Sequence, residues 1–110
     1  MKNDLVYLRH INDAIEKIES YTDMSKDDFM STSHWQDATI RNLEIIGEAV
    51  KRLSEELKEH NPEIPWRNVA GLRDILIHHY MGVDLETVWN VVKNDLPGLK
   101  KIVARVLEQY

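Results

Sequence analysis

The side chains best suited to chemistry in this sequence lie close together between residues 73 and 80. They are Arg73, Asp74, His78, His79 and Tyr80, set among aliphatic residues. Elsewhere the polar residues alternate with apolar ones as in amphipathic helices, so packing and solubility explain them. A guanidinium can bind a phosphate, an imidazole can move a proton near neutral pH, and a phenol can carry a modification. We therefore expect the functional site in this stretch.

The geometry of a helix limits how these groups can act together. At about 100° per residue, Arg73 and His78 lie roughly 140° apart on a continuous helix, whereas Asp74 shares a face with His78 and Arg73 shares one with Tyr80. Arg73 and His78 converge if the helix unwinds at its end. They also converge if two copies of the chain meet at a two-fold axis near that end. We favour the second arrangement.

The reason is the chemistry that such a dimer would support. Cleaving RNA through its own 2′-hydroxyl requires a base, an acid and a cation that stabilises charge on the phosphate, but no metal. A symmetric dimer would supply two guanidiniums from Arg73 and two imidazoles from His78 in one cleft. Asp74, one turn before His78, would fix the tautomer of the imidazole and favour its protonated form.

Taken singly, each of these residues has a simpler explanation. A histidine at a helix end is usually a surface group that stabilises the helix dipole, and an arginine such as Arg73 is more often an ion-pair partner. Tyr80 alone would be read as a residue at the edge of the core with a hydrated hydroxyl. The combination favours a functional site.

Length and composition predict one small, soluble, all-α domain spanning residues 1–110. The chain has 110 residues, 43% hydrophobic and 30% charged, with four glycines and three prolines. It has no cysteine, which excludes disulfides and cysteine nucleophiles and fits the cytoplasm. No apolar run is long enough to cross a bilayer, and the first residues lack the apolar core of a signal peptide. The net charge of -5 disfavours general nucleic-acid binding, so any such contact must be local.

Apolar residues at three- and four-residue steps predict four main helices in an up-and-down bundle. The first should run from Leu5 to about Tyr21, followed by a short entry segment, residues 26–30, that Ser25 caps with Asp28. The second, capped by Ser33 with Gln36, should continue without interruption to residues 60–62 and be the longest. The apolar stripe of this second helix comprises Ile40, Leu43, Ile46, Gly47, Val50, Leu53 and Leu57.

The second helix also carries Arg41, Glu44, Glu48 and Arg52 at steps of three, four and four residues. Opposite charges at this spacing pair weakly on a helix surface, so a solvated ladder of ion pairs is the favoured interpretation. If this face meets the stretch 73–80, the two glutamates would instead orient its cations. The sequence does not decide between the two.

The third helix should begin at Pro65, with Trp66, Val69, Leu72 and Leu76 forming its buried stripe, and should loosen before Gly82. Asp84 should cap the fourth helix, which Pro97 should kink or break into two packed halves. The buried residues of the fourth helix should be Val88, Val92, Leu99, Ile102, Val103 and Val106.

Metal binding and base stacking are weaker hypotheses. None of the five histidines follows an acidic residue by three positions, so the Glu-x-x-His pair of di-iron bundles is absent. The adjacent pair His78 and His79 would point in different directions on a helix. Trp35, Trp66 and Trp89 could stack on bases, but each is more often a core or interface residue.

The spacing of Arg73, His78 and Tyr80 resembles the R-x4-H-x-Y signature of HEPN domains, specifically of HepT-like ribonuclease toxins. The same family is resembled, in the same order, by residues 41–49 (RNLEIIGEA), 62–66 (PEIPW), 83–86 (VDLE) with Trp89, and 94–97 (NDLP). One departure is His79, where the family often has glycine. A larger, titratable residue there would narrow the cleft or take part in the chemistry.

This resemblance implies a HEPN helical bundle that works as a homodimer with a composite cleft. It implies metal-independent endoribonuclease activity on cellular RNA, with Arg73 and His78 as the catalytic pair and no cofactor. It also implies a partner, a minimal nucleotidyltransferase antitoxin, that silences the toxin by attaching AMP to Tyr80. The other function class is a catalytically silent HEPN dimer that binds a nucleotide or a protein. We prefer the ribonuclease because a binding module would need neither Arg73 nor His78.

Overall fold

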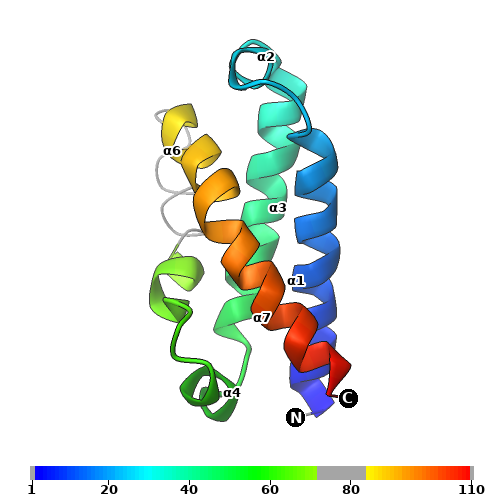
Figure 1. Cartoon of the computed structure of the whole chain (residues 1–110), viewed down its shortest axis with the longest axis vertical. Helices are drawn as coiled ribbons and strands as arrows, with labels where there is room; N and C mark the ends of the chain where they lie inside the picture. Colours follow the sequence, from blue (N-terminus) through cyan, green and yellow to red (C-terminus); the bar gives the residue numbers. More distant parts are fainter. Residues whose placement is uncertain (1, 72–83, 110) are drawn as a thin grey trace.

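Helices form all of the regular structure in residues 2–71 and 84–109, the part of the chain that this computed structural model describes. The helix α1 (Lys2–Tyr21) lies beside α3 (Ser33–Lys51), and α7 (Leu96–Glu108) crosses α1 (Figure 1). The start of α1 and the end of α7 lie at the same end of the bundle (Figure 1). The predicted all-α bundle is confirmed.

The apolar stripe of α1 forms one wall of the core. Leu8, Ile11, Ile15 and Ile18 are at most 1% exposed, and they recur at the three- and four-residue steps that place them on one helix face. The helix ends at Tyr21, as predicted. Burying four large aliphatic side chains of this kind contributes about 1.5–3 kcal/mol each before the entropy cost of ordering them.

The short helix α2 (Lys26–Met30) was expected to be an entry segment, and it also contributes to the core. The Ser25 hydroxyl accepts a hydrogen bond from the backbone N–H of Asp28 at 3.1 Å, so the predicted cap is confirmed. Phe29 is fully buried and its ring lies 5.2 Å from that of Trp89. The segment therefore connects α1 to α3 along the chain and also packs against Trp89 through Phe29.

The predicted cap of the second helix is wrong in its details. The cap position is Thr32, whose side chain makes no capping bond there, and Ser33 is the first helical residue. The Gln36 side chain does not reach back to a cap. Its amide nitrogen donates to the carbonyls of Phe29 and Met30, at 2.9 and 3.0 Å, and thereby ties α3 to the end of α2.

The second helix is also not continuous to residue 60, so the prediction that it is the longest is wrong. It stops at Lys51, and Ser54 caps a separate helix α4 (Glu55–His60) by accepting from the Leu57 N–H at 3.2 Å. Asp4 of α1 stabilises the turn between the two helices. Its two carboxylate oxygens accept hydrogen bonds from the Ser54 N–H and hydroxyl, at 2.8 and 2.6 Å. The predicted apolar stripe is otherwise confirmed, with all members buried except Ile40, which is half-buried.

The next helix begins at Trp66, one residue later than predicted, and residues 66–71 of it are described. The Pro65 carbonyl accepts the first backbone hydrogen bonds, from Asn68 and Val69. Trp66 is buried and Val69 half-buried, as the predicted stripe requires. Its remaining members, Leu72 and Leu76, and the predicted end before Gly82 lie outside the described residues.

The last part of the chain is helical from Leu85 to Glu108, with an irregular turn in the middle. Asp84 caps α6 (Leu85–Asn90) through the Glu86 N–H, as predicted. A π-helix, η1 (Val91–Asp95), follows and leads into α7. Pro97 lies in the first turn of α7, so the irregular turn precedes the proline, and the chain neither breaks nor leaves the helical path there. All six predicted core positions of this helix are buried.

None of the helices in residues 2–71 and 84–109 is long and apolar enough to cross a membrane.

Candidate functional site

The five residues that carry the predicted site, Arg73, Asp74, His78, His79 and Tyr80, lie outside the described residues. The structure describes what leads to them: the helical turn of residues 66–71 on one side and Asp84 on the other. It also describes the two supporting glutamates, Glu44 and Glu48. Their predicted contact with residues 73–80 likewise lies outside the described part of the chain.

The charged stripe of α3 forms the two ion pairs that its spacing predicts. Arg41 Nη1 lies 3.7 Å from a carboxylate oxygen of Glu44, and Arg52 Nη2 lies 3.2 Å from one of Glu48. Pairs of this kind on a helix surface contribute only about 0.2–0.5 kcal/mol each. The stripe is therefore not a source of much stability.

The two glutamates are not simply solvated, because they line a groove of about 480 Å³ between α1 and α3. The side chain of Glu44 is only 23% exposed. Tyr7 and His10 of α1 form the opposite wall, and their rings meet edge to face with centroids 6.2 Å apart. Sequence reasoning did not single out these two residues, and its only signal for them was an i, i+3 spacing on one face of α1.

The electrostatics of the groove are balanced. It contains two arginines, Arg41 and Arg52, and two glutamates, Glu44 and Glu48, so their formal charges cancel. The Tyr7 hydroxyl and then the Glu48 carboxylate raise the pKa of Arg52, which stays charged. A balanced groove does not attract a phosphate backbone, since nucleic-acid binding depends on clustered positive charge. The charges of this groove therefore do not favour RNA binding.

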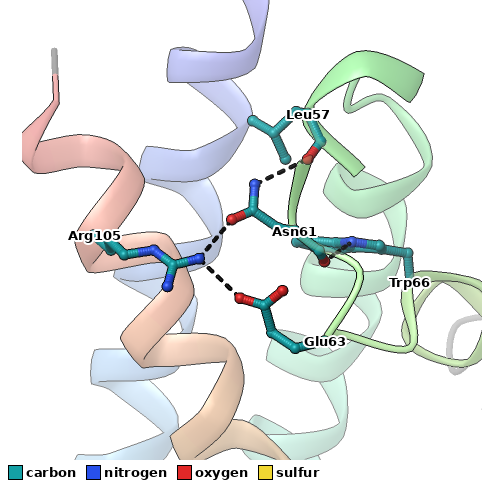
Figure 2. A network of polar contacts seen from close by, with 5 residues as sticks. All are labelled: Leu57, Asn61, Glu63, Trp66 and Arg105. Atoms are coloured by element: carbon teal, nitrogen blue, oxygen red, sulfur yellow. Dashed lines mark hydrogen bonds and ion pairs between the residues drawn. The ribbon is translucent and has the colours of Figure 1, made fainter. Parts of the chain in front are cut away.

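The loop before the helix of residues 66–71 is fixed by buried polar contacts (Figure 2). Asn61 is 7% exposed, and its side-chain amide donates to the Leu57 carbonyl of α4 at 2.9 Å. The Asn61 carbonyl accepts from the indole N–H of Trp66 at 2.9 Å and from the N–H of Ile64 at 3.3 Å. The end of α4 and the start of the helix of residues 66–71 are thus joined through one residue.

The three tryptophans pack against other side chains of this chain. Trp66 is 8% exposed, and the ring of Trp35 stacks on Tyr21 with centroids 5.5 Å apart. Trp89 contacts Phe29, and the ammonium of Lys93 lies 4.7 Å from its ring centroid. The packing interpretation of these residues is therefore preferred over a base-stacking one.

The residues that could bind a metal do not gather in the described part of the chain. Within residues 2–71 and 84–109, no three His, Cys, Asp or Glu side chains are placed to hold one ion together.

Comparison with protein families gives a match to one known family over most of the chain. The family described as ribonuclease HepT-like matches residues 11–106, a range that includes Arg73, His78 and Tyr80. The chain belongs to the HepT-like ribonuclease family. The predicted family resemblance is therefore confirmed, and the matched range includes α1 from Ile11 onward as well as the segments from Arg41 onward.

Relatives from several organisms carry ribonuclease names. A protein of Thermococcus cleftensis named "Probable ribonuclease HepT" is 50% identical over 95 residues, which cover 86% of each chain. A "Putative RNase" of Caldanaerobacter subterraneus subsp. tengcongensis is 40% identical over 110 residues, 99% of this chain and 98% of the relative. These HepT-like proteins match this chain over nearly their full length.

A third relative is longer. A protein of Methanocaldococcus jannaschii named "Gamma-glutamylcyclotransferase and putative RNase" is 49% identical over 111 residues. The match covers 99% of this chain and 50% of that protein, so the chain spans half of the relative's length. No solved structure is significantly similar to this HepT-like chain.

Proposed function

We propose that this chain is the ribonuclease toxin of a toxin-antitoxin pair and that it cleaves RNA without a metal through the RNA's own 2′-hydroxyl. One observation carries the proposal: the HepT-like family match runs from residue 11 to residue 106, and the stretch it spans includes both Arg73 and His78. Relatives of nearly the same length bear ribonuclease names, which supports RNA as the substrate class.

The proposed site is shared by two copies of the chain. His78 from each protomer serves as the base for the 2′-hydroxyl or as the acid for the leaving 5′-oxygen, and Arg73 stabilises the charge on the phosphate. Asp74 orients the imidazole of His78. The roles of His79, which stands where the family often has glycine, and of Glu44 and Glu48 on α3 are secondary in this scheme.

The proposed regulation acts on Tyr80. A minimal nucleotidyltransferase partner transfers AMP from ATP to the Tyr80 phenol oxygen, which loses its proton while pyrophosphate leaves. The product carries a negatively charged phosphate close to Arg73 and His78 in the sequence. That phosphate occupies the cleft and repels RNA.

Expression of the chain alone tests the activity. We expect slowed growth and fragmented cellular RNA, and we expect Arg73→Ala and His78→Ala each to relieve both effects. Glu59→Gln, an exposed change on α4, serves as a control that should remain toxic. Unchanged growth with intact RNA would instead support a catalytically silent dimer that binds a nucleotide or a protein, an alternative that the net charge of -5 favours.

Incubation with ATP and a small nucleotidyltransferase encoded beside this chain tests the regulation. The mass of the chain should increase by that of one AMP group, with the label on Tyr80, and Tyr80→Phe should stay unmodified. Label on another residue would refute the assignment of Tyr80, while leaving the proposed RNA cleavage intact.

A further inference from the structure

Arg105 of α7 binds the loop that leads to the helix of residues 66–71 (Figure 2). Its Nη2 atom donates to the side-chain oxygen of Asn61 at 2.7 Å and to a carboxylate oxygen of Glu63 at 2.8 Å. Both bonds are charge-assisted on the donor side, so they are stronger than bonds between neutral groups. The loop is therefore held against α7, as well as against α4 through Asn61.

These contacts reach across the chain rather than along it. Arg105 lies 44 residues after Asn61 and 42 after Glu63. Asn61 is buried and its side chain is satisfied at both ends, by Arg105 and by the Leu57 carbonyl. Because a buried amide left without partners is unfavourable, these bonds favour the loop position in which Asn61 reaches both partners.

The same loop sets the rotation of the helix that follows it. The indole N–H of Trp66, the first helical residue, donates to the Asn61 carbonyl, and the ring is buried. Each helical residue turns the chain by about 100°, so the orientation of the first turn determines how residues 66–71 leave the loop. Arg73 follows the last described residue of this turn, Gly71, by two positions in the sequence.

We propose that Arg105 and Asn61 are positioning residues for RNA cleavage: they hold the loop and Trp66, and so fix the place from which the chain enters the segment that contains Arg73 and His78. This inference rests on the proposed function. Neither residue touches the substrate. A misplacement of about 1 Å in a catalytic group can lower a rate roughly 100-fold. Loss of the few polar bonds that hold this loop is therefore sufficient to lower the rate of cleavage.

Steady-state cleavage of a fluorescently labelled single-stranded RNA by the purified full chain tests the proposal. Arg105→Ala should lower kcat by about tenfold or more and change KM by less than about twofold, since positioning is lost and RNA contacts are kept. Arg105→Lys should recover part of kcat, because an ammonium can still donate to one of the two acceptors. Glu63→Gln, which removes only the charge of one acceptor, should lower kcat less than Arg105→Ala.

A matched control exists on the same helix. Lys100 of α7 pairs with Glu19 of α1 at 2.9 Å, and the side chains of this pair are 45% and 51% exposed, close to the 52% and 47% of Arg105 and Glu63. Lys100→Ala removes a comparable ion pair whose partner, Glu19, lies on α1 and not on the loop. It should leave kcat and KM unchanged.

The results separate this inference from the function it rests on. A rise in KM with kcat unchanged would make Arg105 an RNA contact and overturn the positioning role. So would a loss of kcat that only matches the fraction unfolded in a thermal melt, or an equal loss in Lys100→Ala. If the unsubstituted chain does not cleave RNA, the proposed function fails and this inference fails with it.

Discussion

Glu63 illustrates how a half-exposed carboxylate is held in its ionised form. Its own backbone N–H and then the Arg105 guanidinium lower the pKa of the Glu63 carboxyl below its ordinary value of 4.5. A lowered folded-state pKa means that the ionised form is favoured by folding. The contribution to stability is therefore present above pH 4.5 and is lost as the pH falls through the lower folded-state pKa.

This sign gives a pH-dependent prediction for Glu63→Gln. At pH 7 the variant should melt at a slightly lower temperature than the unsubstituted chain, because the ion pair with Arg105 is gone and such exposed pairs are weak. At a second, acidic pH below the lowered pKa of the folded-state carboxyl, the difference should shrink towards zero, because the Glu63 carboxylate of the unsubstituted chain is then protonated too. Thermal unfolding followed by circular dichroism measures it. Glu59→Gln should show no such trend, and an equal difference at both pH values for Glu63→Gln would contradict the prediction.

Asn61 shows which part of a residue's role a sequence can reveal. Asn61 followed by Pro62 predicts a helix end correctly, because proline disfavours helix in the residue before it. Its burial and its bonds to Arg105 and Trp66 are not predictable from local sequence. One of those partners lies 44 residues away, and no periodic pattern connects them.

The turn between α3 and α4 depends on a contact from α1. The buried carboxylate of Asp4, 3% exposed, accepts two hydrogen bonds from Ser54, whose hydroxyl in turn caps α4. Apolar residues Val50, Leu53 and Leu57 keep helical spacing through the turn, so periodicity predicts one long helix. The break was missed because the stabilising residue lies 50 positions earlier.

The same contact predicts the cost of removing Asp4. Asp4→Ala should lower the free energy of unfolding by about 1–3 kcal/mol, because the Ser54 N–H and hydroxyl lose their partner in a partly buried place. Asp4→Asn should cost less, since its side-chain oxygen can still accept one bond. Urea denaturation measures both. Asp13→Ala, at an exposed position of the same helix, should change stability by no more than about 0.5 kcal/mol, and equal effects at the two positions would refute the role of Asp4.

The irregular turn before α7 was predicted from the sequence only in part. Proline at position 97 predicts a disturbance, because its missing N–H cannot bond to the carbonyl four residues earlier. The disturbance in the structure is the π-helix Val91–Asp95, which ends where the Leu96 N–H donates to the Val91 carbonyl. The buried stripe of Val88, Val92 and Leu99 continues across it. Composition and spacing do not distinguish a π-helical turn from a kink, since both keep the apolar residues on one side.

At the scale of the whole molecule, the distribution of charge bears on how RNA could bind. The chain carries a net charge of -5, and the groove between α1 and α3 has two arginines balanced by two glutamates. A single copy therefore offers RNA little general attraction. Two copies sharing a cleft would concentrate four functional groups from Arg73 and His78 at one place, which makes the dimer the more effective arrangement.

A mixed dimer tests whether one active cleft can draw its groups from different copies. The variants Arg73→Ala and His78→Ala are unfolded together and refolded, so that some dimers contain one of each. Each pure dimer lacks either both guanidiniums or both imidazoles, whereas a mixed dimer retains one Arg73 from one protomer and one His78 from its partner. We expect cleavage of labelled RNA to appear only in the co-refolded mixture, at a level below that of the unsubstituted chain.

Native mass spectrometry confirms which dimers are present, and mixing the two variants without unfolding serves as the control. If mixed dimers form and RNA stays intact, one guanidinium and one imidazole shared between two protomers are not sufficient for cleavage, and the cleft must then use both His78 side chains or an Arg73 and a His78 from the same copy.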